Sequence, residues 1–406
     1  NLKRTALSCT LLTTLLTSAS ATKEISGTQN AFAINGETVT IKSGAIVGIG
    51  KAQVGNAVSS NSSIVVSNNG NTNKSSITIE KDGRLNSRIF SSYQAKIKDI
   101  IIHGSIGAGP SNASIINFRG TIIEKIEVGR TGVLEGGIIN SWFKNGGTAS
   151  GNSKINNIDI KGEVKGGIKN QSGTMQTISI AGSVSGDIIN NKTMQSISVS
   201  NGTVNGNIVN SGTNASTGNI SITGTSNVGG SIVNQNGANF NNQITLDQNS
   251  KLGGISNNAN STMSGQLTLN GEVGTITNAG KFDSTLTLSN KVGQINNAEG
   301  GTISNDITIN NGGSVGTLAN AGTMQNITIQ QQGKVENITN SGTMQAITNN
   351  GTGTLTLTNS GGTIDKITNG TNATATIHNQ GKITNGIIND GGTLTVFNDF
   401  RKDESA

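Results

Sequence analysis

The sequence contains very little proline, cysteine, aromatic residue or charge. Its 406 residues include one Pro, one Cys, one Trp and one Tyr, and only 12% are charged. The near absence of Pro, with a net charge of +6, argues against Pro-rich disorder, and a single Cys excludes a disulfide scaffold. The missing three-residue period excludes collagen. Because 32% apolar residues supply little bulk for a compact core, we expect a chain that folds by stacking small units.

Glycine, with 57 copies, and asparagine, which is about as frequent, dominate a repeat of about 21 residues. The phrase Gly173-Thr174-Met175-Gln176 has close copies around Met194, Met324 and Met344. A short strand with alternating apolar residues, a Gly/Asn turn and a second strand follow the phrase. The alternation has period two, which predicts strands. We therefore predict an all-β, single-stranded parallel β-helix of about 14 rungs, with a period of about 20–23 residues.

Two further series share this register. One inward column is predicted at Met175, Met194, Met263, Phe282, Ile303, Met324 and Met344. One Asn ends the second strand of each unit, at Asn170, Asn190, Asn210, Asn234, Asn257, Asn278, Asn297, Asn320, Asn340, Asn359, Asn379 and Asn398, with Asn117 and Asn140 as less regular members. Side-chain amides stacked at one corner can form a structural ladder, and Asn also tolerates left-handed backbone at tight corners. The alternative is plain turn preference without a ladder.

A column of Ser and Thr lies at the outward position of the first strand. Its members are Ser179, Ser198, Ser221, Thr245, Thr268, Thr287, Thr308 and Thr328. These residue types are good strand formers, so a solvated surface is one interpretation. The other is a contact face for glycans, for a second copy of the chain or for ordered water.

The N-terminal segment 1–21 is predicted to be a signal peptide for Sec export. Lys3 and Arg4 precede an apolar stretch, and Ala19-Ser20-Ala21 supplies the small residues that signal peptidase accepts. Cys9 lies inside this segment, so we expect the mature chain to carry no Cys. The domains that follow are residues 22–100, an N-terminal cap with irregular first rungs, residues 101–398, the β-helix array, and residues 399–406, a truncated tail or linker.

Charge is uneven along the chain. Residues 1–170 carry 19 Lys and Arg against 10 Asp and Glu, whereas residues 171–406 carry 9 against 12. A basic cluster is predicted at Lys81, Arg84, Arg88, Lys96 and Lys98. It is either a solvated face or a patch that meets anionic sugars. Nucleic acid is not an expected partner, because the aromatic residues that stack on bases are missing.

Catalytic and metal-binding patterns are scarce. His103 and His378 lie far apart, and neither has a second His or a Cys at metal-ligand spacing, so we expect no metal, no other cofactor and no Ser-His-Asp triad. Carbohydrate hydrolysis would need converging carboxylates. Asp159 and Asp187, about one rung apart with Lys161 nearby, are the one place where acids and bases come close. The sequence therefore favours a chain that is not an enzyme.

A signal segment followed by Gly/Asn/Ser/Thr-rich rungs resembles the passenger domain of bacterial autotransporters. The Gly-Thr-Met-Gln, Ile-Thr-Ile and Ile-Thr-Asn-Ser-Gly phrases resemble the adhesin-type passengers, over roughly residues 22–398. The resemblance implies a β-helix at the bacterial cell surface, held in the outer membrane by a C-terminal barrel or released. No barrel strands follow residue 398 in this sequence, which puts surface anchoring in doubt.

From the repeat, the export signal and the resemblance, we expect an adhesin or autoaggregation factor that mediates attachment to host cells. Its expected partners are a host-cell surface protein, matrix or glycan, or a second copy of the chain. Two alternatives stay open: a polysaccharide-active β-helix enzyme, and a structural surface-layer or filament protein.

Overall fold

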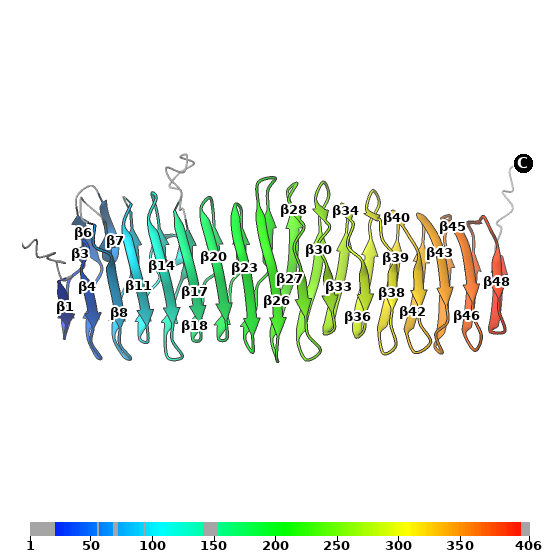
Figure 1. Cartoon of the computed structure of the whole chain (residues 1–406), viewed down its shortest axis with the longest axis horizontal. Helices are drawn as coiled ribbons and strands as arrows, with labels where there is room; N and C mark the ends of the chain where they lie inside the picture. The colour runs from blue at the N-terminus through cyan, green and yellow to red at the C-terminus, as the bar shows by residue number, and fades with distance from the viewer. Residues whose placement is uncertain (1–20, 55–56, 68–71, 93, 141–152, 399–406) are drawn as a thin grey trace, which may run out of the picture.

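The chain forms a long rod of stacked turns (Figure 1). The computed structural model describes residues 21–54, 57–67, 72–92, 94–140 and 153–398. They build a parallel β-solenoid of about 17 turns with a period of about 21 residues, so the predicted fold class is confirmed. The signal segment, apart from Ala21, and the tail 399–406 lie outside the described residues.

Each turn contributes backbone to two sheets, which we call sheet A and sheet B. Among the described residues, sheet A has 23 strands. In chain order they are β1 (Thr22–Ile25), β4 (Thr38–Ile41), β8 (Ser75–Ile79), β11 (Lys96–Ile102), β14 (Ile122–Val128), β17 (Lys154–Ile160), β20 (Thr174–Ile180), β23 (Thr193–Ser200), β26 (Ser216–Thr223), β28 (Asn239–Phe240), β29 (Ile244–Leu246), β31 (Thr262–Met263), β32 (Leu267–Leu269), β34 (Lys281–Phe282), β35 (Leu286–Leu288), β37 (Thr302–Ile303), β38 (Ile307–Ile309), β40 (Thr323–Met324), β41 (Ile327–Ile329), β43 (Thr343–Asn349), β45 (Thr363–Asn369), β47 (Lys382–Ile383) and β48 (Ile387–Asn389).

Sheet B has 26 strands in the part of the chain that the structure describes. They are β2 (Thr28–Gln29), β3 (Phe32–Ile34), β5 (Ile46–Val47), β6 (Gly50–Val54), β7 (Ala57–Val66), β9 (Arg84–Leu85), β10 (Arg88–Ser91), β12 (Ser105–Ile106), β13 (Ala113–Asn117), β15 (Val133–Leu134), β16 (Gly137–Asn140), β18 (Glu163–Val164), β19 (Ile168–Asn170), β21 (Ser183–Val184), β22 (Ile188–Asn190), β24 (Thr203–Val204), β25 (Ile208–Ser211), β27 (Asn227–Gln235), β30 (Lys251–Asn257), β33 (Glu272–Asn278), β36 (Lys291–Asn297), β39 (Ser314–Asn320), β42 (Lys334–Asn340), β44 (Thr354–Asn359), β46 (Thr374–Asn379) and β49 (Thr393–Asn398). A 3-10 helix, η1 (Pro110–Asn112), precedes β13.

Strands of successive turns pair in parallel, and their inward side chains fall into columns. In β20 and β23, Met175 lies opposite Met194 and Ile178 opposite Ile197. Further along, Met263 is followed by Phe282, in the order expected from the sequence. The inward residues form one continuous buried cluster along the rod. Burying an Ile or Leu side chain stabilises a fold by about 2 kcal/mol, so each turn depends on its neighbours to cover its apolar residues.

The region 22–100 belongs to the same solenoid. β1 pairs with β4, β4 with β8 and β8 with β11, all in parallel. The exception is β6, which folds back antiparallel on β7 as a hairpin. These turns lack the Thr-Met-Gln phrase and the terminal Asn, which is why the predicted count of about 14 rungs was too low against about 17.

Glycines allow the turns between the sheets to stack closely. A Cβ added at Gly182 would lie 2.1 Å from the carbonyl oxygen of Gly162 in the preceding turn. Real Cβ atoms do not come that close to an oxygen, so a side chain at this position would push the two turns apart. Close packing of stacked turns therefore explains why glycine is needed at such positions.

Candidate binding surfaces

The predicted Asn series forms a line of side-chain amides along the end of sheet B, buried from Asn117 to Asn379 and exposed at Asn398. Asn257 Nδ2 donates to Asn278 Oδ1 at 2.9 Å, and Asn278 Nδ2 donates to Asn297 Oδ1 at 2.8 Å. The same bond joins neighbouring members from Asn117 to Asn190 and from Asn210 to Asn398. Every bond runs from the donor in one turn to the acceptor in the next. We call this line the sheet B ladder.

The ladder amides also bond to the backbone of the turns. Asn278 Nδ2 lies 3.1 Å from the carbonyl oxygens of Gly280 and Thr302, so the amide also bonds to the backbone of its own turn and of a neighbouring one. Left-handed backbone, the second reason given for Asn, is wrong for the ladder, because its members end extended strands. Left-handed asparagines occur elsewhere, at Asn201, Asn236 and Asn260 among others.

One link in the ladder contains a threonine. Asn190 Nδ2 donates to Thr217 Oγ1 at 2.9 Å, and Thr217 Oγ1 donates to Asn210 Oδ1 at 2.9 Å. Thr217 occupies the inward column opposite Met194, where the sequence suggests an apolar residue. Its hydroxyl accepts one bond and donates another, so it keeps the direction of the ladder.

A second, shorter ladder lies at the end of sheet A and was missed in the sequence. Asn349 Nδ2 donates to Asn369 Oδ1 at 3.1 Å, and Asn369 Nδ2 donates to Asn389 Oδ1 at 2.8 Å. The available signal was the spacing, because each of these Asn residues follows an inward Ile by two positions, as in the sheet B ladder.

The predicted Ser/Thr column lies on the outer face of sheet A. Ser198 pairs with Ser221, Ser221 with Thr245 and Thr245 with Thr268, in one line along the rod. Thr287, Thr308 and Thr328 continue it, and Thr348 and Thr368 extend it beyond the predicted end. Most of these side chains are half-buried and Thr287 is exposed. We call this line the hydroxyl column. It presents neutral hydroxyl groups at a spacing of about 4.8 Å.

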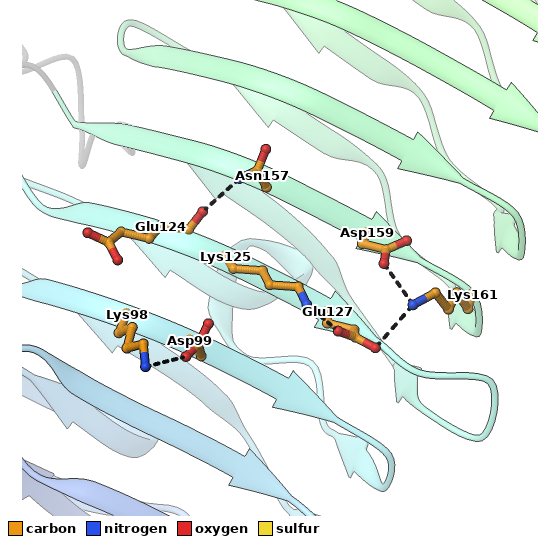
Figure 2. A network of polar contacts seen from close by, with 8 residues as sticks. All are labelled: Lys98, Asp99, Glu124, Lys125, Glu127, Asn157, Asp159 and Lys161. Atoms are coloured by element: carbon orange, nitrogen blue, oxygen red, sulfur yellow. Dashed lines mark hydrogen bonds and ion pairs between the residues drawn. The ribbon is translucent and has the colours of Figure 1, made fainter.

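Towards the N-terminus, acidic residues replace the hydroxyls in the same column. Ser179 pairs with Asp159, and Asp159 pairs with Glu127. Figure 2 shows these carboxylates beside Lys125 of β14 and Lys161, which directly follows β17. Lys161 Nζ lies 2.9 Å from Asp159 Oδ2 and 3.2 Å from Glu127 Oε1. Lys125 forms a further ion pair with Glu127.

This network changes the acidity of its members. A hydrogen bond from Lys125 lowers the pKa of Glu127 from its ordinary value, and a bond from Lys161 adds to the effect, while partial burial opposes it. The bonds from Lys161 to Asp159 and to Glu127 raise the pKa of Lys161. Glu127 and Lys161 therefore each stabilise the charged form of the other, which is the property of a structural ion-pair network.

The structure does not bring the two candidate acids together. Asp159 is on the outer face of sheet A, whereas Asp187 lies in the turn between β21 and β22 of sheet B. Asp187 Oδ1 accepts the backbone N–H of Asn207 at 2.7 Å. Asp247 Oδ2 accepts the backbone N–H of Gly224 at 2.6 Å in the same manner. Each of these carboxylates thus holds together the loops of two adjacent solenoid turns by a hydrogen bond.

The predicted basic cluster is divided in the structure, and its inclusion of Arg88 as a surface residue is wrong. Arg88 is 6% exposed, its Nη1 donates to the carbonyl oxygen of Pro110 at 3.0 Å, and its Nε donates to Ser62 Oγ at 3.2 Å. Burial lowers its pKa. Lys96 and Lys98 are exposed on sheet A, whereas Arg84 is exposed on sheet B and Lys81 lies in the turn between the sheets. The five residues therefore do not form one patch.

The two histidines occupy unrelated positions. His103 lies in a turn after β11, and His378 stacks on Phe397 with ring centroids 4.8 Å apart on the outer face of sheet B. Among the described residues, no group of three or more His, Cys, Asp or Glu side chains could hold a metal ion. In the same part of the chain, no helix has the length and apolar character needed to span a membrane.

Comparison with known proteins does not assign a function to any of these surfaces. No protein-family model matches the sequence, and no curated protein is significantly similar to it.

Proposed function

We propose that the chain is a non-enzymatic attachment rod of the bacterial cell surface, acting as an adhesin or autoaggregation factor. The main observation behind this proposal is the hydroxyl column. It offers a neutral outer face to a partner over many consecutive turns, and β-solenoids commonly use such extended surfaces for binding. The use of Asp187 and Asp247 as turn braces supports a binding function over a catalytic one.

The fold is a parallel β-solenoid that is compatible with an autotransporter passenger domain. On that basis we propose Sec-dependent export, display at the outer membrane or release from it, and host-cell protein, matrix, glycan or a second copy as the partner. Fold alone does not define the partner, so the proposal depends on a binding measurement.

The test compares the two outer faces in the same turns. One variant carries Thr268→Glu, Thr287→Glu and Thr308→Glu in the hydroxyl column. The matched control carries Thr275→Glu, Gln294→Glu and Thr317→Glu, which form an outward line on sheet B. Both variants add the same charge to neighbouring rungs, and all six side chains are half-buried or exposed.

The measurements are retention of host epithelial cells on a surface coated with the full chain, and sedimentation of the full chain at increasing concentration. We expect the sheet A variant to lose attachment or self-association by about tenfold, because the new carboxylates are desolvated in the contact. We expect the sheet B control to stay within about twofold of the wild type. The proposal fails if the wild type neither attaches nor self-associates, and the hydroxyl column loses its assigned role if both variants lose binding equally.

A further inference from the structure

A cleft of about 330 Å³ opens on the edge of the rod near its N-terminal end. It lies where three successive turns join sheet A to sheet B. Lys81, Asp82, His103, Ser105 and Thr131 line it, together with the backbone of two glycines. We call it the turn cleft. Its lining combines positive charge with hydroxyl and amide groups.

The shape of the cleft depends on close stacking of its turns. A Cβ on Gly129 would lie 2.3 Å from His103 Nδ1, so the imidazole ring lies directly against the backbone of the next turn. Thr131 Oγ1 donates to the carbonyl oxygen of His103 at 2.7 Å. These contacts hold the floor and one wall of the cleft in place.

The cations of this region are not neutralised within the chain. Lys81, Arg84 and Arg130 take part in no ion pair among the described residues, and all three side chains are exposed. Arg84 follows Gly83 of the cleft, and Arg130 precedes Thr131. Asp82 is the acid among the lining residues.

Two neighbouring carboxylates, Glu80 and Glu127, are already engaged by other lysines. Glu80 accepts Lys42 Nζ at 3.1 Å and the backbone N–H of Ser43 at 3.2 Å, and both bonds lower the pKa of Glu80. Glu127 is bonded to Lys125 and Lys161. With Arg84 and Arg130 beside it, the cleft keeps an excess of positive charge over Asp82 and over Glu163, which pairs with Val133 of the lining from the next turn.

The unpaired cations are also spread along the rod axis. Lys81 and Arg130, which have no ion pair among the described residues, lie two turns apart on this edge of the rod, with His103 in the turn between them. Beyond Lys161, the next two equivalent turns are neutral, with Ala181-Gly182 and Asn201-Gly202. Successive turns are about 4.8 Å apart, so Lys81 and Arg130 are about 10 Å apart along the rod axis, a distance that a linear polyanion can span better than a single small anion.

From this geometry we propose that the turn cleft binds a linear polysaccharide that carries carboxylate or sulfate groups. Arg84 and Arg130 have the planar guanidinium group that pairs with such oxyanions through two hydrogen bonds. Ser105 and Thr131 supply hydroxyl groups for the sugar ring. A nucleic acid would use aromatic side chains for base stacking, and the cleft lining contains no Phe, Tyr or Trp. The inference deepens the proposed attachment function by naming a ligand class.

The experiment measures binding of the full chain to immobilised heparin, a sulfated polysaccharide, and to polygalacturonate, a carboxylated one, at about 0.15 M salt. Neutral dextran, a DNA duplex and vesicles with anionic phospholipid are the comparison surfaces. We expect binding to one or both acidic polysaccharides and none to dextran. Tighter binding to DNA or to the vesicles than to either acidic polysaccharide would overturn the ligand class.

Two variants that each lose three positive charges distinguish binding at the cleft from general electrostatic attraction to the chain. The cleft variant carries Lys81→Gln, Arg84→Gln and Arg130→Gln, and the control carries Lys169→Gln, Lys192→Gln and Lys291→Gln, which are exposed lysines in other turns. We expect the cleft variant to bind about tenfold more weakly and the control to stay within about twofold. Equal weakening in both variants would overturn the site.

A third variant is expected to act in the opposite direction. Asp82→Asn removes the acid of the cleft, and Asn accepts the left-handed backbone of Asp82, whose φ is 64°. We expect binding to tighten by about two- to threefold because repulsion of the ligand is removed. Unchanged or weaker binding would contradict the assignment of Asp82.

The two proposals can fail separately. If the wild type retains cells but binds neither acidic polysaccharide, the ligand assignment is wrong and the attachment function stands. If it binds the polysaccharide through the cleft and neither retains cells nor self-associates, the site stands and the attachment function is wrong.

Discussion

The two sheets of the solenoid finish their strands in different ways. In sheet B, the inward residue at the strand end is Asn from Asn117 onwards. In sheet A, the equivalent residue is aliphatic in every turn up to Ile329. In the next turn it is Asn349. The same place in the fold is therefore filled by an apolar side chain on one side of the rod and by an amide on the other.

The difference shows what an inward amide needs in order to be stable. Asn278 has a neighbouring Asn on both sides and two backbone carbonyls within reach of its Nδ2, so all its polar groups are bonded. An aliphatic residue needs only apolar neighbours. A lone Asn in an aliphatic column would leave a buried polar group unpaired, which costs about 1–3 kcal/mol, so amides occur in uninterrupted series.

The start of the sheet B ladder supports this explanation. Its column begins with Ile34 and Val66, continues with Ser91, and then changes to Asn117. Ser91 Oγ donates to Asn117 Oδ1 at 3.2 Å and to the carbonyl oxygen of Ile116 at 3.1 Å. A hydroxyl thus joins the apolar part of the column to the amide part, as Thr217 does inside the ladder.

The largest predicted effect comes from breaking the interior of the sheet B ladder. Asn278→Ile removes the acceptor of Asn257 and the donor to Asn297, and leaves two turn carbonyls without that donor. We expect the free energy of unfolding to fall by about 3 kcal/mol, measured by denaturant unfolding. Asn296→Ile, at an outward position of the next turn, is the control and should change it by less than about 0.5 kcal/mol. Equal effects would contradict the assignment.

Thr217→Val tests the hydroxyl bridge with a side chain of the same shape. The change removes the bonds to Asn190 and Asn210, and we expect a loss of about 2 kcal/mol in the free energy of unfolding. Thr217→Ser keeps the hydroxyl and should lose about 1 kcal/mol, because only a methyl group is removed. A valine variant as stable as the serine variant would show that the bridge contributes nothing.

Asn349→Ile sharpens the comparison at the first member of the sheet A ladder. This residue follows Ile329, so isoleucine would extend the aliphatic column by one turn and leave no ladder donor of a preceding turn without its acceptor. Asn369 and the carbonyl oxygen of Thr374 would lose a donor, and the backbone N–H of Gly351 would lose an acceptor. We expect a cost of about 1 kcal/mol, clearly below that of the same substitution at Asn278, in the same unfolding measurement. A larger cost than at Asn278 would refute the column argument.

The smallest predicted effect is in the ion-pair network on sheet A. In the folded chain the pKa of Glu127 is below its ordinary value, so the folded state binds fewer protons there than the unfolded state. Its contribution is therefore present above the ordinary pKa and is lost as the pH falls through the folded pKa. We expect Glu127→Gln to cost less than about 1 kcal/mol at neutral pH.

Unfolding of the wild type and of Glu127→Gln across pH checks this sign. The difference between them should shrink as the pH falls below 4.5, the ordinary pKa of Glu, and Glu127 becomes protonated. Carboxylates outside this ion-pair network have the same surroundings in both proteins, so their contributions cancel in the comparison. A difference that grows on acidification would contradict the direction of the shift.

The sequence was most informative where one side chain repeats in every turn. Period-two alternation and the spacing of the Asn residues gave the strands and the members of the sheet B ladder, because register is set by which residues face inward. Thr217 could not be predicted, since the longer turn before it shifts the spacing of that unit. Arg88 was misplaced because charged residues are rarely buried, and its partners Ser62 and Pro110 are far from it in sequence.

Surface relationships were harder to predict than the core. Asp159 and Asp187 are about one repeat apart, yet they lie on different sheets, because the residues between them include the change from sheet A to sheet B. The turn cleft was missed for the same reason, since Lys81, His103 and Thr131 meet only when three turns are stacked.

Exchange of the side-chain amide protons of Asn, followed by NMR in the full chain, tests the central structural claim most directly. If the buried ladders hold adjacent turns together, the amide protons of members such as Asn257 and Asn278 will exchange as slowly as backbone N–H groups of the core strands, while those of outward residues such as Asn296 exchange fast. Fast exchange at all asparagine side chains would contradict the claim that amide ladders hold the rod together.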